Sequence, residues 1–143
     1  MSEQQQGVIP HLVVDNATAA LDFYKKALGA SEVMRMPAED GKRLMHAELN
    51  INGARVFVRD HFPEYCSGKD THRQVPPKEL SGTPVALHLE VPNADAAIKQ
   101  AADAGARVSM PAEDMFWGAR YGQVVDPFGH AWSFAHPLPG NRG

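Results

Sequence analysis

Two histidines stand in matching sequence surroundings and could do chemistry together. His11 opens the segment His-Leu-Val-Val-Asp-Asn-Ala, and His88 opens the related segment His-Leu-Glu-Val-Pro-Asn-Ala. Imidazole titrates near neutral pH and is also a common metal ligand, so such a pair suits either proton transfer or metal binding. His46 and Glu48 lie two residues apart on one predicted strand, share a face of it, and extend the same two possibilities.

A second group of side chains favours ligand binding. Trp117 and Tyr121 lie close together in the second half of the chain, while Phe57 and Trp132 fall on the predicted last strand of each half. Trp and Tyr offer a large contact area with a polar group at one end, which suits a small aromatic or amphipathic ligand. Arg120 could orient an anionic group of that ligand. The alternative is that these rings fill the sheet and its helix contacts.

The two histidines belong to an internal repeat. His11–Leu21 aligns without a gap on His88–Ile98, and each stretch runs through an alanine-rich helical pattern to a Gly-Ala pair. The pentapeptide Met-Pro-Ala-Glu-Asp then occurs in both halves, at residues 36–40 and 110–114. Such self-similarity indicates one structural unit that is present twice.

Each half has the pattern of one strand, one helix and three further strands. Asn16 and Asn93 are predicted helix N-caps, and Gly29 and Gly105 end the apolar helical spacing. The predicted strands are residues 8–14, 31–36, 43–51 and 55–59 in the first half, and 85–91, 107–110, 121–125 and 131–135 in the second.

Turn signals show where the strands reverse. Asn52-Gly53 predicts a tight hairpin, and Asp126-Pro127-Phe128-Gly129 has the residue order of a type I turn, so we assign Asp126 and His130 to that turn rather than to catalysis. The predicted fold class is α+β, with a first module at residues 8–59 and a second at residues 84–136. Residues 60–83 form a long loop between them, which is either a linker or a lid.

Composition excludes some classes of partner. The 143 residues carry a net charge of -3, which argues against a nucleic-acid surface because such a surface must be basic. No apolar run is long enough to span a bilayer, and residues 1–7 do not resemble a signal peptide. The single cysteine, Cys66, cannot form an internal disulfide, which favours the cytoplasm, and we interpret it as an incidental thiol.

Four motifs resemble those of one known superfamily. They are Ala20–Tyr24, Met45–Leu49, Phe116–Gly122 and Asp126–His130. Together with the duplicated βαβββ pattern they resemble the vicinal oxygen chelate superfamily, which includes glyoxalase I, the fosfomycin and bleomycin resistance proteins and the extradiol dioxygenases, and within it the PhnB-like branch. The resemblance runs from about Val8 to His136 and implies tandem βαβββ modules that form a cupped mixed sheet, the glyoxalase/bleomycin resistance fold.

The resemblance also indicates where metal ligands would lie. Metal-dependent members of that superfamily take two ligands from each module, and these positions fall at Ile9, Phe57, Ala86 and Ser133. None of these side chains is a usual ligand of a divalent ion, so the resemblance implies that the inherited metal site is lost, and no cofactor is predicted. The alternative is a divalent metal held by new ligands drawn from His11, His46, Glu48 and His88.

Two functions follow from the resemblance. The first is a binding protein of the bleomycin-resistance kind, which holds a small aromatic or amphipathic molecule. Its predicted ligand-binding residues are His11, Phe57, His88, Trp117, Arg120, Tyr121 and Trp132. The second is a metal-dependent lyase, isomerase or dioxygenase, for which the sequence assigns no catalytic residue. Related modules often pair between two chains, so the resemblance also implies a homodimer with two equivalent pockets.

Overall fold

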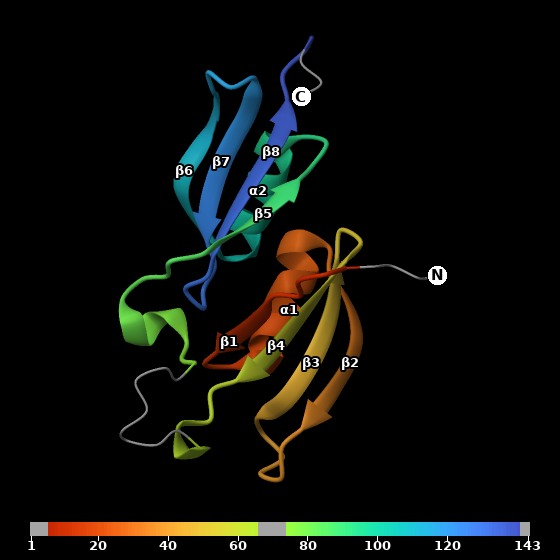
Figure 1. Ribbon diagram of the computed structural model, residues 1–143, viewed down its shortest axis with the longest axis vertical. Coiled ribbons are helices and arrows are strands. Elements are labelled where there is room, and N and C mark those ends of the chain that lie inside the picture. Colours follow the sequence, from red (N-terminus) through yellow and green to blue (C-terminus); the bar gives the residue numbers. More distant parts are fainter. Residues whose placement is uncertain (1–5, 66–73, 141–143) are drawn as a thin grey trace.

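The chain folds into two modules, each a four-stranded mixed sheet with one α-helix, placed end to end (Figure 1). The structure is a computed structural model that describes residues 6–65 and 74–140. The first module contains β1 (His11–Val14), α1 (Ala17–Leu28), β2 (Ser31–Pro37), β3 (Leu44–Ile51) and β4 (Ala54–Asp60). The second contains β5 (Ala86–Glu90), α2 (Ala94–Ala104), β6 (Arg107–Asp114), β7 (Ala119–Val125) and β8 (Ala131–Pro137). The predicted α+β fold of tandem βαβββ modules is confirmed.

Both sheets have the same strand order, and their parallel strand pairs have equivalent registers. The orders are β1-β4-β3-β2 and β5-β8-β7-β6, and in each sheet the first strand pairs in parallel with the last. This pairing sets His11 opposite Phe57 and His88 opposite Ser133. The predicted hairpin joins β3 to β4, since Asn52 and Gly53 have φ values of 56° and 90°, the positive values that a tight two-residue turn requires.

The predicted helix caps are confirmed by hydrogen bonds. The side-chain oxygen of Asn16 accepts from the N–H of Ala19, and that of Asn93 accepts from the N–H of Ala96, both at 3.0 Å. Gly29 ends α1 in the left-handed conformation, with φ 68°. Local sequence signals therefore place both helices correctly.

A second cap on each helix comes from the end of the last strand in the same module. The carboxylate of Asp60 accepts from the N–H groups of Ala17, at 2.9 Å, and Leu44, at 2.7 Å. In the second module the Nδ1 atom of His136 accepts from the N–H of Ala94 at 2.8 Å. Asp60 is therefore a buried residue of β4, not the first residue of the loop to which the sequence pattern assigned it.

The loop between the modules contains two short 3-10 helices, Pro63–Tyr65 and Pro77–Leu80. Pro77 packs against the turn after β7, because a Cβ added at Gly129 would lie 2.9 Å from the Cβ of Pro77. Cys66 lies outside the described residues. No helix within the two described ranges is both long and apolar enough to cross a bilayer.

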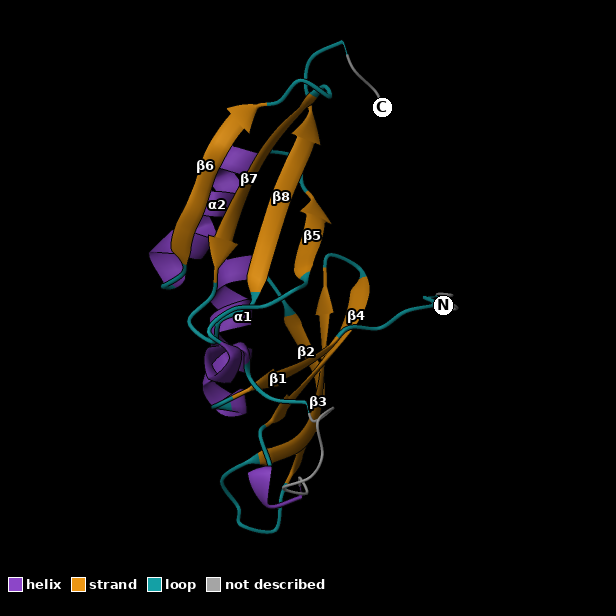
Figure 2. Ribbon diagram, turned by 60° about the vertical axis from the view of Figure 1, so that its left-hand side comes forward, coloured by secondary structure: helices purple, strands orange, loops and turns teal. Residues whose placement is uncertain are grey.

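Each helix covers one face of its own sheet, and both helices lie on the same side of the molecule (Figure 2). We call the other face of each sheet its open face. Side chains on the helix side, such as Val56, Val58 and Phe134, are buried in the core. Gly122 allows α2 to approach closely, because a Cβ there would lie 2.5 Å from the Cδ1 atom of Ile98. Within the part of the chain that the structure describes, no α-helix covers the open faces, which are therefore available for a site.

A buried carboxylate joins the two modules. Asp126, in the turn between β7 and β8, is 4% exposed, and its Oδ1 atom accepts from the N–H groups of Phe128 and His130, both at 2.9 Å. Its Oδ2 atom accepts from the hydroxyl of Tyr24 on α1 at 2.5 Å and from the indole N–H of Trp132 at 2.8 Å. The predicted turn is confirmed by the bond from the N–H of Gly129 to the carbonyl of Asp126 at 3.0 Å.

Replacement of Tyr24 by Phe should reveal this connection. Because a hydrogen bond to a buried charged group is worth more than a neutral one, we expect Tyr24→Phe to lower the free energy of unfolding by about 2 kcal/mol at pH 7, and Tyr121→Phe by less than about 1 kcal/mol. The control is suitable because the hydroxyl of Tyr121 bonds the neutral side chain of Gln123. Urea denaturation of both variants measures the two losses, and equal losses would contradict the assignment.

The effect of Tyr24 should also depend on pH. Burial, followed by the charge of Asp126, raises the pKa of Tyr24 well above its usual value of 10.0. The folded protein therefore retains a proton that the unfolded chain releases near pH 10, so this stabilisation is complete below pH 10 and is lost as the pH rises further. We expect the difference in stability between wild type and Tyr24→Phe to shrink above pH 10.

Candidate functional site

The second module carries a cavity of about 660 Å³ on its open face. We call it the open-face cavity. It includes three of the predicted ligand-binding residues, His88, Trp117 and Tyr121, together with Ser133. Its walls are formed by Ala86, His88, Glu90, Trp117, Gly118, Ala119, Tyr121, Ser133, Ala135 and Pro137.

Strand geometry explains which side chains reach the cavity. Alternate residues of a strand share a face, so His88 and Glu90 on β5 point the same way, and Ser133 on the neighbouring β8 joins them. Trp117 comes from the turn between β6 and β7. The N–H of Gly118 donates to the carbonyl of Met115 at 3.1 Å, and the N–H of Leu138 donates to the carbonyl of Gly118 at 3.0 Å, so the turn is fixed on both sides of the indole.

A chain of hydrogen bonds crosses the floor of the cavity. The Oγ atom of Ser133 lies 2.7 Å from the Nδ1 atom of His88, and the Nε2 atom of His88 lies 2.6 Å from the carboxylate of Glu90. The ring of Tyr121 lies nearly parallel to that of His88, with centroids 6.0 Å apart. The amide of Gln123 donates to the hydroxyl oxygen of Tyr121 at 2.9 Å. The cavity thus combines a polar floor with aromatic walls.

Two predicted binding residues, Trp132 and Arg120, lie on the helix side of the sheet instead. Trp132 is 2% exposed and packs against Tyr24, with ring centroids 5.5 Å apart. The guanidinium of Arg120 bonds Asp95 of α2 at 2.6 Å and Asp114 at 2.8 Å. Both residues directly neighbour cavity residues along their strands and therefore face the opposite way. The expectation that they line the pocket is corrected by the structure.

The remaining predicted residues, His11 and Phe57, lie on the open face of the first module. Their ring centroids are 5.6 Å apart, and His46 packs edge to face against Phe57 at 4.6 Å. Burial, and then the charges of Arg59 and His46, lower the pKa of His11 below its usual value of 6.5. His11 lies on the first sheet and His88 on the second, and the cavity that includes His88 does not include His11.

The side chains of the described residues are not arranged as a metal site. Among residues 6–65 and 74–140, no group of three or more His, Cys, Asp or Glu side chains is placed to hold a metal ion. Both ring nitrogens of His88 are already hydrogen-bonded. The carboxylate of Glu48 pairs with Arg55 at 2.8 Å, and this hydrogen bond lowers the pKa of Glu48. Neither side chain is free to act as a new ligand in this conformation.

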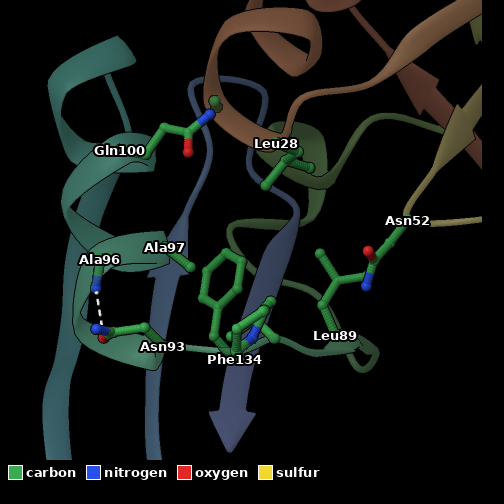
Figure 3. Close-up of a pocket in the computed structure, with 11 residues that line it drawn as sticks. Leu28, Asn52, Leu89, Asn93, Ala96, Ala97, Gln100 and Phe134 are labelled. Carbon is green, nitrogen blue, oxygen red and sulfur yellow. Dashed lines mark hydrogen bonds between the residues drawn. The ribbon is translucent and has the colours of Figure 1, made fainter.

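A smaller cavity of about 290 Å³ lies between the modules, and we call it the seam cavity (Figure 3). Leu28, Leu89 and Phe134 converge on it. Hydrogen bonds across the seam run from the amide of Asn52 to the carbonyl of Glu90, at 3.0 Å, and from the amide of Gln100 to the carbonyl of Lys26, at 2.9 Å. The residues that line it include no titratable side chain, whereas the open-face cavity is lined by His88, Glu90 and Tyr121.

The fold and the site define a class of protein with duplicated βαβββ modules and a cavity on the open face of a sheet. Residues 8–134 match the model of the Glyoxalase/Bleomycin resistance protein/Dioxygenase superfamily. The chain belongs to this superfamily, and the resemblance seen in its motifs is confirmed.

Relatives of known sequence and structure agree with this assignment. The chain is 50% identical over 129 residues to the uncharacterized protein Rv0887c of Mycobacterium tuberculosis, which covers 90% of this chain and 73% of that protein. The X-ray structure of the Arabidopsis thaliana gene product At5g48480 superposes with a TM-score of 0.67 at 30% identity, covering 92% of this chain and 99% of the other. The PhnB protein from Bacillus cereus shares the fold, with a TM-score of 0.65 at 16% identity and coverage of 92% and 99%.

The placement of the two tryptophans can be tested by fluorescence quenching. Trp117 is 52% exposed beside the cavity, whereas Trp132 is buried and hydrogen-bonded to Asp126. We expect iodide to quench the emission of the wild-type protein in part, and Trp117→Phe to abolish the accessible fraction, since iodide reaches only indoles in contact with water. The residual emission should be shifted to the blue. Strong quenching of the Trp117→Phe variant would contradict the buried position of Trp132.

Proposed function

We propose that the open-face cavity of the second module binds a small aromatic or amphipathic molecule. The observation that carries this proposal is the pairing of Trp117 and Tyr121, whose rings meet edge to face at 5.8 Å, beside the polar floor at His88 and Ser133. A volume of about 660 Å³ falls within the range of small-molecule sites, and aromatic walls with a few polar groups are typical of them.

The charges around the cavity narrow the class of ligand. Arg120 is held by Asp95 and Asp114 on the helix side, so it is not available to pair with an anionic group. The exposed carboxylate of Glu90 lies in the cavity wall and disfavours an anion there. We therefore infer a neutral or cationic aromatic ligand, with a hydroxyl, carbonyl or amide group directed at the floor.

We also propose that two copies of the chain associate. Phe116 is 97% exposed at the tip of the turn that carries Trp117, and the first module presents His11, His46 and Phe57 on a sheet face without a covering helix. Large apolar groups left in water favour association. A homodimer would cover such surfaces.

We further propose a cytoplasmic location, because the sequence contains a single cysteine and so cannot form an internal disulfide.

The ligand proposal predicts a specific loss of affinity. With the neutral fluorescent dye N-phenyl-1-naphthylamine as the probe, we expect saturable binding to the wild-type protein, unchanged by EDTA. Loss of the indole contact in Trp117→Ala should weaken binding about tenfold, which corresponds to about 1.4 kcal/mol. Arg120→Gln, on the opposite face, should change the Kd by less than about twofold. No binding to the wild type, or equal Kd values for wild type and Trp117→Ala, would contradict the proposal.

The association proposal predicts a mass of twice 15.6 kDa in sedimentation velocity experiments. Because Phe116 is the most exposed aromatic ring described, we expect Phe116→Glu to shift the protein toward monomer while leaving its far-ultraviolet circular dichroism spectrum unchanged. Lys99→Glu, a charge reversal on the exposed side of α2, serves as the control and should leave the dimer intact. A wild-type protein that stays monomeric at high concentration would rule out the dimer.

A further inference from the structure

The hydrogen-bonded chain in the open-face cavity joins a hydroxyl, an imidazole and a carboxylate in one line. Ser133 and His88 are register partners on adjacent strands, with 2.7 Å between Oγ and Nδ1, and Glu90 lies two residues along β5, 2.6 Å from Nε2. All three residues line the same cavity. The backbone of Glu90 is in turn held by the amide of Asn52 from the first module.

The donors and acceptors in this chain can be assigned from the chemistry of the groups. An ionised carboxylate only accepts hydrogen bonds, so the Nε2 atom of His88 carries the proton that is donated to Glu90. In neutral imidazole the other nitrogen is then an acceptor, and the hydroxyl of Ser133 donates to Nδ1. Ser133 thus faces a base whose tautomer is fixed by a carboxylate, which is the arrangement that activates a serine nucleophile.

The first module shows that the fold does not require this chain. Its equivalent register pair is His11 and Phe57, and Val13 occupies the place of Glu90. The imidazole of His11 packs against rings there without a hydroxyl or a carboxylate in line. The bond between His88 and Glu90 is also exposed to solvent, where such a pair adds only about 0–1 kcal/mol to stability. The hydroxyl of Ser133, 2% exposed, needs its hydrogen bond to His88 in any case, but structural need does not explain the carboxylate of Glu90 in line with them.

We propose that Ser133, His88 and Glu90 form a nucleophile, base and orienting acid that cleave ester bonds of aromatic or amphipathic molecules in the open-face cavity. The inference rests on the proposed function, because the substrate would occupy the same cavity. The hydroxyl of Tyr121 accepts from Gln123 and so keeps its own proton free to donate toward a substrate oxygen. Such a donor can stabilise negative charge on a carbonyl oxygen.

The reaction proceeds in two balanced steps. The Oγ atom of Ser133 forms a bond to the carbonyl carbon while its proton passes to Nδ1 of His88, and the alkoxide of the ester leaves with that proton as an alcohol. A water molecule then attacks the acyl group on Ser133, gives one proton to Nδ1 of His88, and releases the carboxylic acid as the proton returns to Oγ. One ester and one water become one acid and one alcohol, with no oxidant or metal required.

Covalent labelling of the full chain with an ethyl fluorophosphonate tests this assignment. We expect one adduct per chain in the intact mass, located on the peptide with Ser133, and none in Ser133→Ala. His88→Gln should slow labelling by at least about 100-fold, as expected for loss of a general base, and Glu90→Gln by about tenfold. The matched controls Ser109→Ala and Glu113→Gln, exposed on the edge strand β6, should label at the wild-type rate. Hydrolysis of p-nitrophenyl acetate should follow the same order.

Two further measurements separate the outcomes. Thermal midpoints show whether each variant folds, and binding of N-phenyl-1-naphthylamine reports on the cavity without requiring a reaction at Ser133. Two results would overturn the catalytic inference and leave the proposed function standing. In the first, the wild-type protein binds the dye but forms no adduct. In the second, it binds the dye, and the wild type and His88→Gln are labelled at the same rate. A wild-type protein that is labelled at Ser133 but does not bind the dye supports the nucleophile and overturns the proposed ligand class.

Discussion

The buried carboxylate of Asp126 is the constraint on which the arrangement of the two modules depends. A buried charge is tolerated when hydrogen bonds replace the water that it loses, and Asp126 receives four of them. One comes from Tyr24, 102 residues away in the sequence, so α1 must lie against the turn between β7 and β8. His130 adds a bond from its ring Nε2–H to the carbonyl of Val13 at 2.9 Å. Together these bonds hold both helices on one side and leave both open faces on the other.

With the modules fixed in this way, duplication leaves two sheet faces whose parallel strand pairs have equivalent registers but carry different chemistry. In the first, His11 opposes Phe57 and sits in a cluster of rings. In the second, His88 opposes Ser133 and lies in a line of hydrogen bonds within a cavity. The two register pairs occupy equivalent positions, so the difference between them lies in their side chains. The candidate site therefore belongs to one open face rather than to the seam, where the modules meet through apolar side chains and amide hydrogen bonds.

Part of the site could be predicted from the sequence, and the alternation of side chains along a strand already argues against placing Arg120 in the same pocket as Tyr121. His88, Trp117 and Tyr121 line the cavity as the sequence indicated. Arg120 and Tyr121 are neighbours on β7, and neighbours on a strand point to opposite faces, so the two could not both line one pocket. Ser133 and Trp132 are related in the same way on β8. The alternation of side chains along a strand places the two members of each pair on opposite faces of the sheet. The packing of α2 decides which member is buried.

The sequence by itself determined the repeat, which is visible as similarity between its two halves. It also determined the caps at Asn16 and Asn93, the hairpin at Asn52-Gly53 and the turn at Asp126, because each of these depends on hydrogen bonds or dihedral angles within a few residues. Tertiary structure decided which secondary structure identical segments adopt. The pentapeptide Met-Pro-Ala-Glu-Asp leaves β2 at Pro37 and turns, with Asp40 accepting from the N–H groups of Lys42 and Arg43, yet its second copy stays within β6 as far as Asp114. The second copy remains a strand because β7 pairs along it and Arg120, held by α2, binds Asp114. The partners of a strand, the face that a helix covers and the donors that reach Asp126 come from distant parts of the chain, so no local pattern specifies them.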